Sequence, residues 1–332
     1  MNAAVIGSGA WGSALALCLH RNGHHVKLWC HTVPRAAEIS KTRINPRLPQ
    51  HPLPQDMEVT ADPGCVSDCR LVVIAVPSYA IRSTCRAIAP FLMEDAVLVS
   101  VTKGIESGSF LRMSQVVAEE TGHSVVALTG PSHAEEVATG IPTGCLAACA
   151  DREKAEFVQD AFMSAAFRIY TSPDIIGAEL GGALKNIIAL CAGVCDGLGY
   201  GDNTQAMLMT RGLTEIARLG LTMGAQKDTF AGLAGVGDLI VTCTSRHSRN
   251  RRAGVLIGQG KNPTEAMNTV GAVVEGYYAA ASAWELKSQQ NVEMPIVQAA
   301  YDVLYQGVPA DVAVKALLVR QKKAEAEDAG WH

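Results

Sequence analysis

Hydrophobic residues follow two different patterns along this chain, and the change between them falls near residue 173. Before it, short apolar runs rich in Val, Ile, Leu and Ala alternate with stretches of helical length. Continuous apolar runs separated by helices are typical of parallel strands that are covered on both faces. The expected strands span residues 3–6, 25–29, 58–60, 71–75, 96–100, 124–128, 144–148 and 167–170. Four prolines between residues 46 and 54 exclude regular structure there.

Long helical patterns replace the strands after Pro173. The expected helices span residues 175–195, 204–220, 272–288, 296–305 and 309–321. Because 332 residues exceed a usual single core, we interpret the change of pattern as a boundary between two domains. The predicted fold class is α/β, with a Rossmann-type, doubly wound, mostly parallel sheet in a domain of residues 1–175. An all-helical domain of residues 176–332 follows, and its charged segment 322–332 is expected to be frayed.

The first expected strand runs directly into a glycine-rich turn, Gly-Ser-Gly-Ala-Trp-Gly at residues 7–12, and then into a helix. This is the setting in which a GxGxxG sequence binds a dinucleotide. Gly7 permits the tight turn, Gly9 lets the backbone approach a pyrophosphate, and Gly12 lets the helix pack closely on the strand. The helix N-terminus offers unpaired N–H groups to the phosphates. The alternative is a glycine-rich turn without function.

The residues after the second expected strand indicate which dinucleotide is bound. NAD-selective Rossmann domains place an acidic residue there to bind the ribose 2′-hydroxyl. Here the strand is followed by Cys-His-Thr at residues 30–32, and Glu38 lies well inside the next helix. His31 and Arg35 could instead face a 2′-phosphate, although Arg35 could equally be a solvated helix residue. The sequence therefore predicts NADPH as the preferred cofactor, with NADH also accepted.

Composition narrows the classes of function. A net charge of -4 gives no support to a nucleic-acid or anionic-membrane surface. No apolar run approaches the length of a bilayer span, and no signal peptide precedes the first strand. We therefore expect a cytoplasmic protein. A hydrophobic fraction of 48% is that of a globular chain able to bury a large core.

Ten cysteines need a separate explanation, because six of them form pairs with CxxxC spacing. Zinc sites prefer CxxC spacing with nearby histidines, and these cysteines lie among Ala, Val and Leu. Reduced, buried cysteines acting as small hydrophobic residues are the favoured interpretation, with zinc ligation as the alternative. The pairs are Cys65/Cys69, Cys145/Cys149 and Cys191/Cys195.

Polar residues follow several strands where ligands of a doubly wound sheet bind, beyond the carboxyl ends of the strands. Lys103 follows the fifth expected strand, and Gly130 and Ser132 follow the sixth. A lysine at a strand end followed by glycine is well placed to meet an anionic ligand. An ordinary surface lysine is the alternative.

The helical half contributes one lysine in an apolar setting. Lys185 follows Gly181 and Gly182 in an expected helix, and each glycine weakens a helix by roughly 1 kcal/mol. We therefore expect close approach to a ligand or to another backbone there, although a lone lysine can also extend its ammonium to solvent. Asp238, in a Gly-Asp-Leu sequence, supplies a carboxylate further along.

A dense cationic run, Ser-Arg-Asn-Arg-Arg at residues 248–252, precedes an apolar helix. Ser248, Arg249 and Asn250 together offer a hydroxyl, a guanidinium, an amide and a helix N-terminus. These groups suit a phosphate. A basic surface turn is the alternative.

Together these segments resemble the bacterial NAD(P)-dependent glycerol-3-phosphate dehydrogenases, from residue 3 to about residue 318. Seven segments follow the family's order and spacing. They are the glycine-rich loop and residues 102–104, 130–132, 180–186, 237–239, 248–252 and 274–276. The specific parts are Lys185 with its two preceding glycines and the Ser-Arg-Asn-Arg-Arg run. The family commonly has Ser where Ala10 stands here, so one hydroxyl near the pyrophosphate is missing.

The resemblance implies a fold like that of 6-phosphogluconate dehydrogenase and a reversible reduction of dihydroxyacetone phosphate to sn-glycerol 3-phosphate, which supplies phospholipid synthesis. Lys185 would be the general acid and base, and no metal is expected. The implied substrate-binding residues are Lys103, Gly130, Ser132, Lys185, Asp238, Ser248, Arg249 and Asn250. The implied cofactor-binding residues are Gly7, Gly9, Ala10, Trp11, Gly12, His31, Arg35, Lys103, Ala134, Arg249, Val273 and Glu275.

Two other functions remain open at this point. A hydroxy-acid or ketopantoate-type reductase has the same two-domain architecture, but its carboxylate substrate explains the run at 248–252 less well. A non-catalytic nucleotide sensor would bind NADPH and a protein partner without needing Lys185. A homodimer is the default expectation for an enzyme of this kind.

Overall fold

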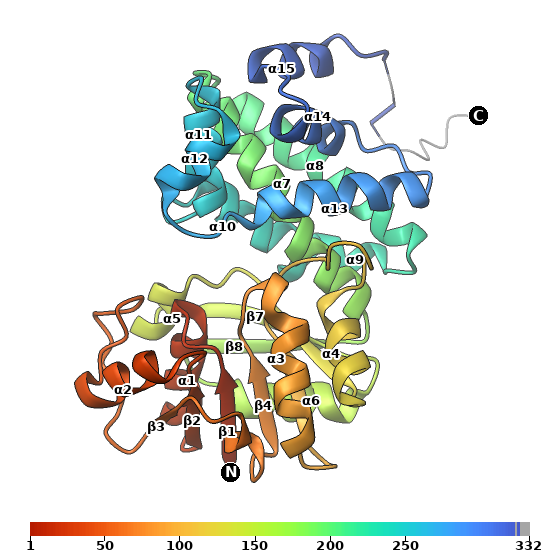
Figure 1. Ribbon diagram of the computed structural model, residues 1–332. Coiled ribbons are helices and arrows are strands. Elements are labelled where there is room, and N and C mark those ends of the chain that lie inside the picture. Colours follow the sequence, from red (N-terminus) through yellow and green to blue (C-terminus); the bar gives the residue numbers. More distant parts are fainter. Residues whose placement is uncertain (323, 326–332) are drawn as a thin grey trace.

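The computed structural model describes residues 1–322, 324 and 325, and it consists of a sheet-containing half and a helical half (Figure 1). All eight expected strands are present, each within two residues of its expected bounds. They are β1 (Asn2–Ile6), β2 (His25–Trp29), β3 (Glu58–Thr60), β4 (Leu71–Ile74), β5 (Val97–Ser100), β6 (Val125–Thr129), β7 (Thr143–Ala148) and β8 (Phe167–Ser172). Of the expected frayed tail, Lys323 and residues 326–332 lie outside the described residues.

The strands form one sheet with the order β3-β2-β1-β4-β5-β6-β7-β8. The first six strands pair in parallel, β7 pairs with β6 in antiparallel fashion, and β8 is parallel to β7. The predicted mostly parallel sheet is therefore confirmed. The chain order reverses beside β1, which lies between β2 and β4, and ligands of such sheets bind at this reversal.

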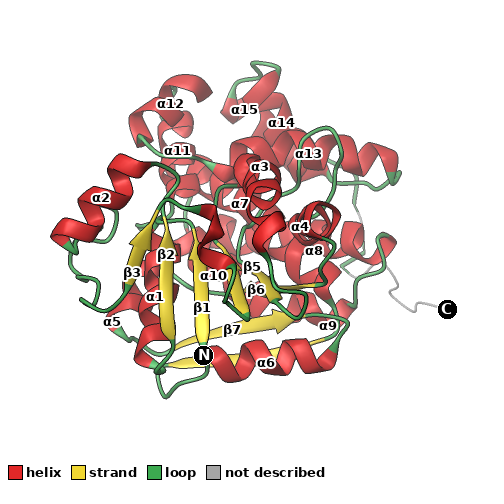
Figure 2. Ribbon diagram, turned by 60° about the horizontal axis from the view of Figure 1, so that its bottom comes forward, coloured by secondary structure: helices red, strands yellow, loops and turns green. Residues whose placement is uncertain are grey.

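Helices cover both faces of the sheet because successive side chains of a strand point to opposite faces (Figure 2). Ala3 and Val5 of β1 belong to the core beneath α1, α2, α5 and α6, whereas Ala4 and Ile6 belong to the core beneath α3 and α4. The helices of this half are α1 (Ala10–Arg21), α2 (Val33–Thr42), α3 (Ile81–Ile88), α4 (Met113–Thr121), α5 (Ala134–Thr139) and α6 (Arg152–Phe162), with short turns η1 (Pro63–Val66), η2 (Ser78–Ala80) and η3 (Ala89–Phe91).

The second half is helical and has its own core around α7. Its elements are α7 (Ile175–Gly197), α8 (Asp202–Thr222), α9 (Lys227–Ala231), the π-helical turn η4 (Leu233–Gly237), α10 (Asp238–Thr244), α11 (Arg249–Gly258), α12 (Pro263–Val270), α13 (Glu275–Gln289), α14 (Pro295–Tyr305) and α15 (Ala310–Leu318). Two expected helices are shorter than predicted. Helix α13 begins three residues later than expected because Gly271 ends α12 with a φ of 70° and Val274 is extended, and α15 ends at Leu318. The predicted division at residues 175/176 falls in the first turn of α7 and stays a prediction.

Helices α7 and α11 cross with their backbones in contact. Gly193 and Gly197 on α7 face Gly254 and Gly258 on α11. A Cβ atom on Gly193 or Gly254 would come within 2.0 Å of a carbonyl oxygen of the other helix. Only glycine permits this separation, so the position of Lys185 on α7 is fixed relative to the start of α11.

One helix needs comment against the expectation that no apolar run approaches the length of a bilayer span. Helix α7 is, by length and composition, apolar enough to cross a bilayer. However, 83% of its most apolar window is buried inside the protein, where it forms the centre of the helical core. A helix at the centre of a protein core resembles a membrane-spanning helix in length and composition, because the core and the bilayer both favour apolar residues on all sides of a helix.

The cysteines behave as the small-hydrophobe interpretation predicts. All ten are free, nine are buried and Cys191 is half-buried. Within the part of the chain that the structure describes, no three His, Cys, Asp or Glu side chains are grouped so as to hold a metal ion.

Candidate active site

The glycine-rich loop links β1 to α1 at the strand reversal. Gly7 has a φ of 126°, and a Cβ on it would lie 2.4 Å from the carbonyl oxygen of Ala75 on the neighbouring strand's end. A Cβ on Gly12 would lie 1.9 Å from the Gly7 oxygen, so loop and helix are in contact. By contrast, a Cβ on Gly9 would meet no described atom within 4 Å.

That open side of Gly9 fits a dinucleotide phosphate. Gly9 is the N-cap of α1, and no described side chain caps the helix. The N–H groups of the first turn, beginning with Ala10 and Trp11, are therefore available to an anion. The residues present thus fit the pyrophosphate of a nicotinamide dinucleotide.

The end of β2 places His31 and Arg35 at the surface. His31 is exposed and lies edge-on to the Trp29 ring, with 6.0 Å between ring centroids. Arg35, on the first turn of α2, pairs with Glu38 through Nη1 and Oε2 at 3.0 Å. This ion pair is solvent-exposed, so it contributes little to stability and can open at small cost.

The two lysines singled out in the sequence meet at one carboxylate. Lys103 Nζ, after β5, donates to Asp238 Oδ2 at 2.7 Å and to the carbonyl oxygen of Gly130 at 3.1 Å. Lys185 Nζ, on α7, donates to Asp238 Oδ1. Asp238 is only 1% exposed, so a single buried carboxylate joins an amine of the sheet half to an amine of the helical half.

Close approach of α7 to the sheet makes this meeting possible. A Cβ on Gly182 would come within 2.9 Å of Thr129 Oγ1 and 3.5 Å of Lys103 Cγ, and a Cβ on Gly181 would come within 2.4 Å of the Ala234 oxygen. The close backbone approach expected of these glycines is present. The cost of two glycines in a helix is offset by bringing Lys185 to the strand ends.

The pKa of Lys185 lies near neutral pH, so both protonation states of its amine are populated there. Burial lowers the pKa of its ammonium to about 7; Asp238 opposes this change and the nearby Lys103 cation adds to it. Thr242, one turn after Asp238 on α10, accepts a second hydrogen bond from Lys185 Nζ at 2.6 Å. An amine held in this way can both donate and accept a proton near neutral pH.

The loop after β6 borders the two lysines. Gly130 has a φ of 149°, and a Cβ there would lie 3.0 Å from the Cys145 backbone. Ser132 Oγ donates to the Gly130 oxygen at 3.1 Å, and Ala134 begins α5. The loop therefore shares one carbonyl oxygen between Ser132 and Lys103.

The predicted phosphate cradle lies at the start of α11. Ser248 caps the helix, accepting from Arg251 N at 3.2 Å. Arg249 is exposed at the first helical position. Asn250 is buried, and its amide binds Asn186 Oδ1 and the N–H of Gly276, both at 2.9 Å. Asn250 thus fixes α11 against α7 and α13, and its second amide hydrogen has no hydrogen-bond partner among the residues that the structure describes.

The start of α13 reaches back to the sheet half. Ser78 Oγ donates to Glu275 Oε2 at 3.0 Å, which joins the loop after β4 to α13. Burial raises the pKa of the Glu275 carboxyl, while Ser78 and Arg249 oppose that change. Val273, two residues earlier, is half-buried at the same edge.

Comparison with known proteins decides the family. The family model described as NAD-dependent glycerol-3-phosphate dehydrogenase N-terminus matches residues 2–155, and the corresponding C-terminus model matches residues 174–315. This chain belongs to the NAD-dependent glycerol-3-phosphate dehydrogenase family. The predicted resemblance is therefore confirmed.

Individual glycerol-3-phosphate dehydrogenases are similar over nearly the whole chain. The glycerol-3-phosphate dehydrogenase (NAD(P)+) of Moorella thermoacetica is 52% identical over 330 residues, covering 99% of this chain and 98% of that protein. The crystal structure of the Coxiella burnetii glycerol-3-phosphate dehydrogenase has a TM-score of 0.92 at 36% identity and covers 96% of this chain and 99% of its own. A ketopantoate reductase from Ralstonia eutropha, at 17% identity and a TM-score of 0.53, shares the fold alone; it covers 88% of this chain and 100% of its own.

Within this family member, sequence analysis missed two side chains that border the lysines. Thr242 lies four residues after Asp238 on α10, and this i, i+4 spacing is a signal that could have identified it. His133 follows Ser132, its Nε2 is buried and unpaired among the described residues, and its ring lies 6.0 Å from that of His247. Burial lowers the pKa of His133.

Proposed function

We propose that this chain catalyses the reversible NAD(P)H-dependent reduction of dihydroxyacetone phosphate to sn-glycerol 3-phosphate, a precursor of glycerophospholipids. The observation that carries the proposal is the contact of Lys103 and Lys185 with Asp238, because it places a buried, titratable amine where the two halves meet. Family membership supplies the substrate and cofactor classes. We place the enzyme in the cytoplasm.

The two halves of the protein bind opposite ends of the substrate. Arg249, Ser248 and Asn250 bind the phosphate at the N-terminus of α11, where the guanidinium and the helix N–H groups both favour an anion. Lys103, with the Gly130 loop and Ser132, holds the other end beside Lys185. The glycine-rich loop and the cofactor-binding residues named above bind the dinucleotide, with Ala134, Val273 and Glu275 along the junction.

Lys185 performs the proton transfer. When bound, NAD(P)H would supply the hydride for the carbonyl carbon, and negative charge would then develop on the carbonyl oxygen. The Lys185 ammonium stabilises that charge and donates its proton to the oxygen. Asp238 and Thr242 hold Nζ in place, and the apolar surroundings of α7 exclude water. In the reverse direction, neutral Lys185 accepts the proton of the substrate hydroxyl.

The pKa of about 7 gives opposite pH profiles for the two directions. Reduction needs the ammonium, so kcat/KM for dihydroxyacetone phosphate is expected to be highest below pH about 7 and to fall as pH rises through it. Oxidation of glycerol 3-phosphate needs the neutral amine, so it is expected to fall as pH drops through the same value. Initial rates from pH 5.5 to 9.5 in constant ionic strength measure both. Profiles that fall together in the two directions would contradict the assignment.

We also propose that NADPH is preferred over NADH. The residues that follow β2, Cys30, His31 and Thr32, include no carboxylate, and Arg35 can turn from Glu38 to a 2′-phosphate. Arg35→Ala is expected to raise the KM for NADPH by about tenfold, the worth of one charged hydrogen bond, and to leave the KM for NADH within twofold. Glu38→Gln is the matched control, since it releases Arg35 and keeps its charge. Equal changes with both cofactors would contradict the proposal.

One set of assays separates this function from its rivals. Initial rates of cofactor oxidation are measured with dihydroxyacetone phosphate, ketopantoate and pyruvate, each with NADPH and NADH. Activity confined to the triose phosphate supports the proposal. Activity confined to the keto acids indicates a ketopantoate-type reductase, and cofactor binding without turnover indicates a nucleotide sensor.

We further propose a homodimer and a domain division at residues 175/176. Closed two-fold assemblies are the commonest state of such enzymes. The exposed Leu318 and Val319 at the end of α15 offer apolar surface on the helical half. Analytical ultracentrifugation measures the assembly.

A further inference from the structure

Hydrogen bonds join the two arms of the loop that carries Lys103. Residues 102–112 leave the end of β5 and enter α4. Ile105 pairs with Arg112 in an isolated antiparallel bridge, and Glu106 N donates to the Leu111 oxygen at 2.9 Å. The Glu106 carboxylate also accepts from Ser109 Oγ at 2.5 Å. These contacts make residues 105–112 a compact turn that begins two residues after Lys103.

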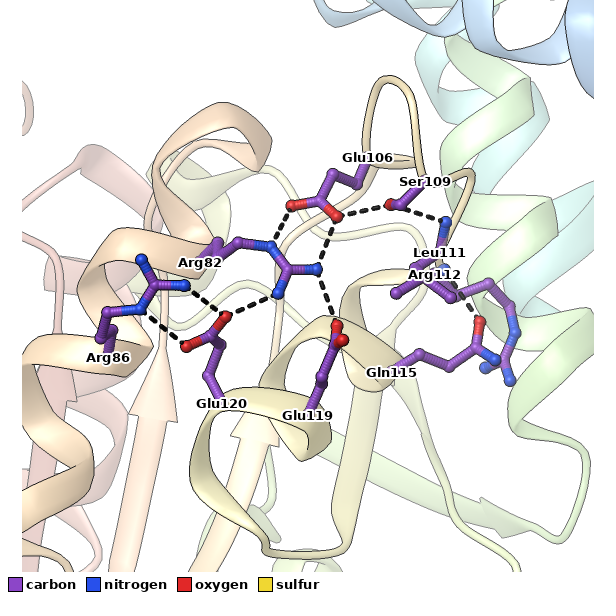
Figure 3. Close-up of polar contacts among 9 residues, drawn as sticks. All are labelled: Arg82, Arg86, Glu106, Ser109, Leu111, Arg112, Gln115, Glu119 and Glu120. Atoms are coloured by element: carbon purple, nitrogen blue, oxygen red, sulfur yellow. Dashed lines mark hydrogen bonds and ion pairs between the residues drawn. The ribbon is translucent and has the colours of Figure 1, made fainter.

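Arg82 on α3 holds Glu106 with a paired contact. Its Nε and Nη2 atoms donate to Glu106 Oε1 and Oε2, both at 2.8 Å (Figure 3). A bidentate pair fixes orientation as well as distance. Arg82 also donates to Glu120 at 2.6 Å and to Glu119 at 2.8 Å, both on α4. Arg82 therefore anchors the loop to two helices of the sheet half.

The far end of the loop is fixed to the helical half. Arg112 pairs with Glu179 on α7, and Ser114 donates to the same carboxylate from N at 2.7 Å and from Oγ at 2.5 Å. Glu179 is 8% exposed and lies six residues before Lys185. The loop thus carries Lys103 near its start and is bound near its end to α7, the helix that carries Lys185. Glu106, between these two points, binds Arg82.

We propose that Arg82 and Glu106 are positioning residues, which hold the Lys103 ammonium between Asp238 and the Gly130 oxygen. Neither side chain touches the site. Arg82 makes a bidentate pair within a network of three carboxylates, so its loss is expected to cost stability as well as placement, and the folding of each variant is checked alongside its activity. A misplacement of about 1 Å at a reacting centre can cost up to a hundredfold in rate. The inference rests on the proposed role of Lys103 in substrate binding.

A double-mutant cycle tests the proposal with the full-length enzyme. Arg82→Met is expected to lower kcat/KM for dihydroxyacetone phosphate about tenfold, and Lys103→Met about tenfold to a hundredfold. If Arg82 acts through Lys103, adding Arg82→Met to Lys103→Met lowers kcat/KM by less than about twofold more. Arg86→Met is the matched control, because Arg86 binds Glu120 at 2.9 and 3.0 Å but does not contact Glu106 (Figure 3). It is expected to remain within twofold of the unsubstituted enzyme.

Two further variants keep the test independent of folding. Glu106→Gln keeps the size of the side chain and is expected to repeat the loss seen with Arg82→Met. Arg82→Lys keeps the charge without the paired contact and is expected to recover only part of the activity. Additive losses in the cycle, or equal losses for Arg86→Met, would overturn the positioning role. Full activity of Lys103→Met would overturn it together with the proposed role of Lys103.

Discussion

Lys185→Ala is expected to lower kcat for dihydroxyacetone phosphate reduction by at least about a hundredfold, the usual scale of general acid catalysis. The substitution removes the proton donor and the cation that faces the developing oxyanion. It does not touch the glycine-rich loop, so the dissociation constant for NADPH should stay within twofold. Steady-state rates and the quenching of NADPH fluorescence measure the two quantities on the same preparation.

Lys185→Arg is the sharper control. It keeps a cation beside Asp238, but a guanidinium does not release its proton near neutral pH. We expect it to bind both ligands and to fail in proton transfer, most completely in the oxidation of glycerol 3-phosphate. Turnover within tenfold of the unsubstituted enzyme in the alanine variant would remove Lys185 from this role.

Arg249→Ala is expected to raise the KM for dihydroxyacetone phosphate by about ten- to a hundredfold, with a smaller change in kcat. A hydrogen bond to a charged group contributes about 1.5–3 kcal/mol, which corresponds to that range. Unphosphorylated dihydroxyacetone lacks the phosphate that Arg249 binds, so its kcat/KM, measured at saturating NADPH, should be unchanged. The ratio of the two substrates' kcat/KM values is therefore the measurement.

Lys261→Ala is the control for general loss of positive charge, because exposed Lys261 lies just beyond the other end of α11. It should leave both substrates unaffected. If Arg249→Ala lowered the kcat/KM of both substrates equally, the phosphate would have to bind elsewhere.

Much of the sheet half could be predicted because its determinants are local. The run Ala3–Val5 is buried on both faces, and the glycines after it are set by contacts within residues 7–12 and the adjacent strand end. Strand direction could not be predicted for β7, because an apolar run gives no sign of which way it runs. Only pairing with Leu128 and its neighbours on β6 shows that β7 is reversed.

The sequence indicates which residues form the centre of the candidate site, but not all of the contacts among them. The family resemblance suggested that Asp238 holds Lys185 or a substrate hydroxyl, yet nothing in the sequence places Lys103 on the same carboxylate. That contact depends on how the two halves pack. The same applies to Arg82, whose partners lie 24 to 38 residues away. Short helices such as α9 and α10 were missed because five to seven residues carry too little periodicity.

The contact of α7 with α11 has a consequence for substrate length. Lys185 lies two turns before Gly193, and Arg249 begins the helix whose Gly254 touches the backbone of α7. This crossing fixes the backbone of Lys185 relative to the backbone of Arg249, because a residue larger than glycine would force the two helices apart. If Lys185 and Arg249 bind the two ends of the substrate as proposed, the fixed backbone separation predicts a lower kcat/KM for ketone phosphates that are one carbon longer.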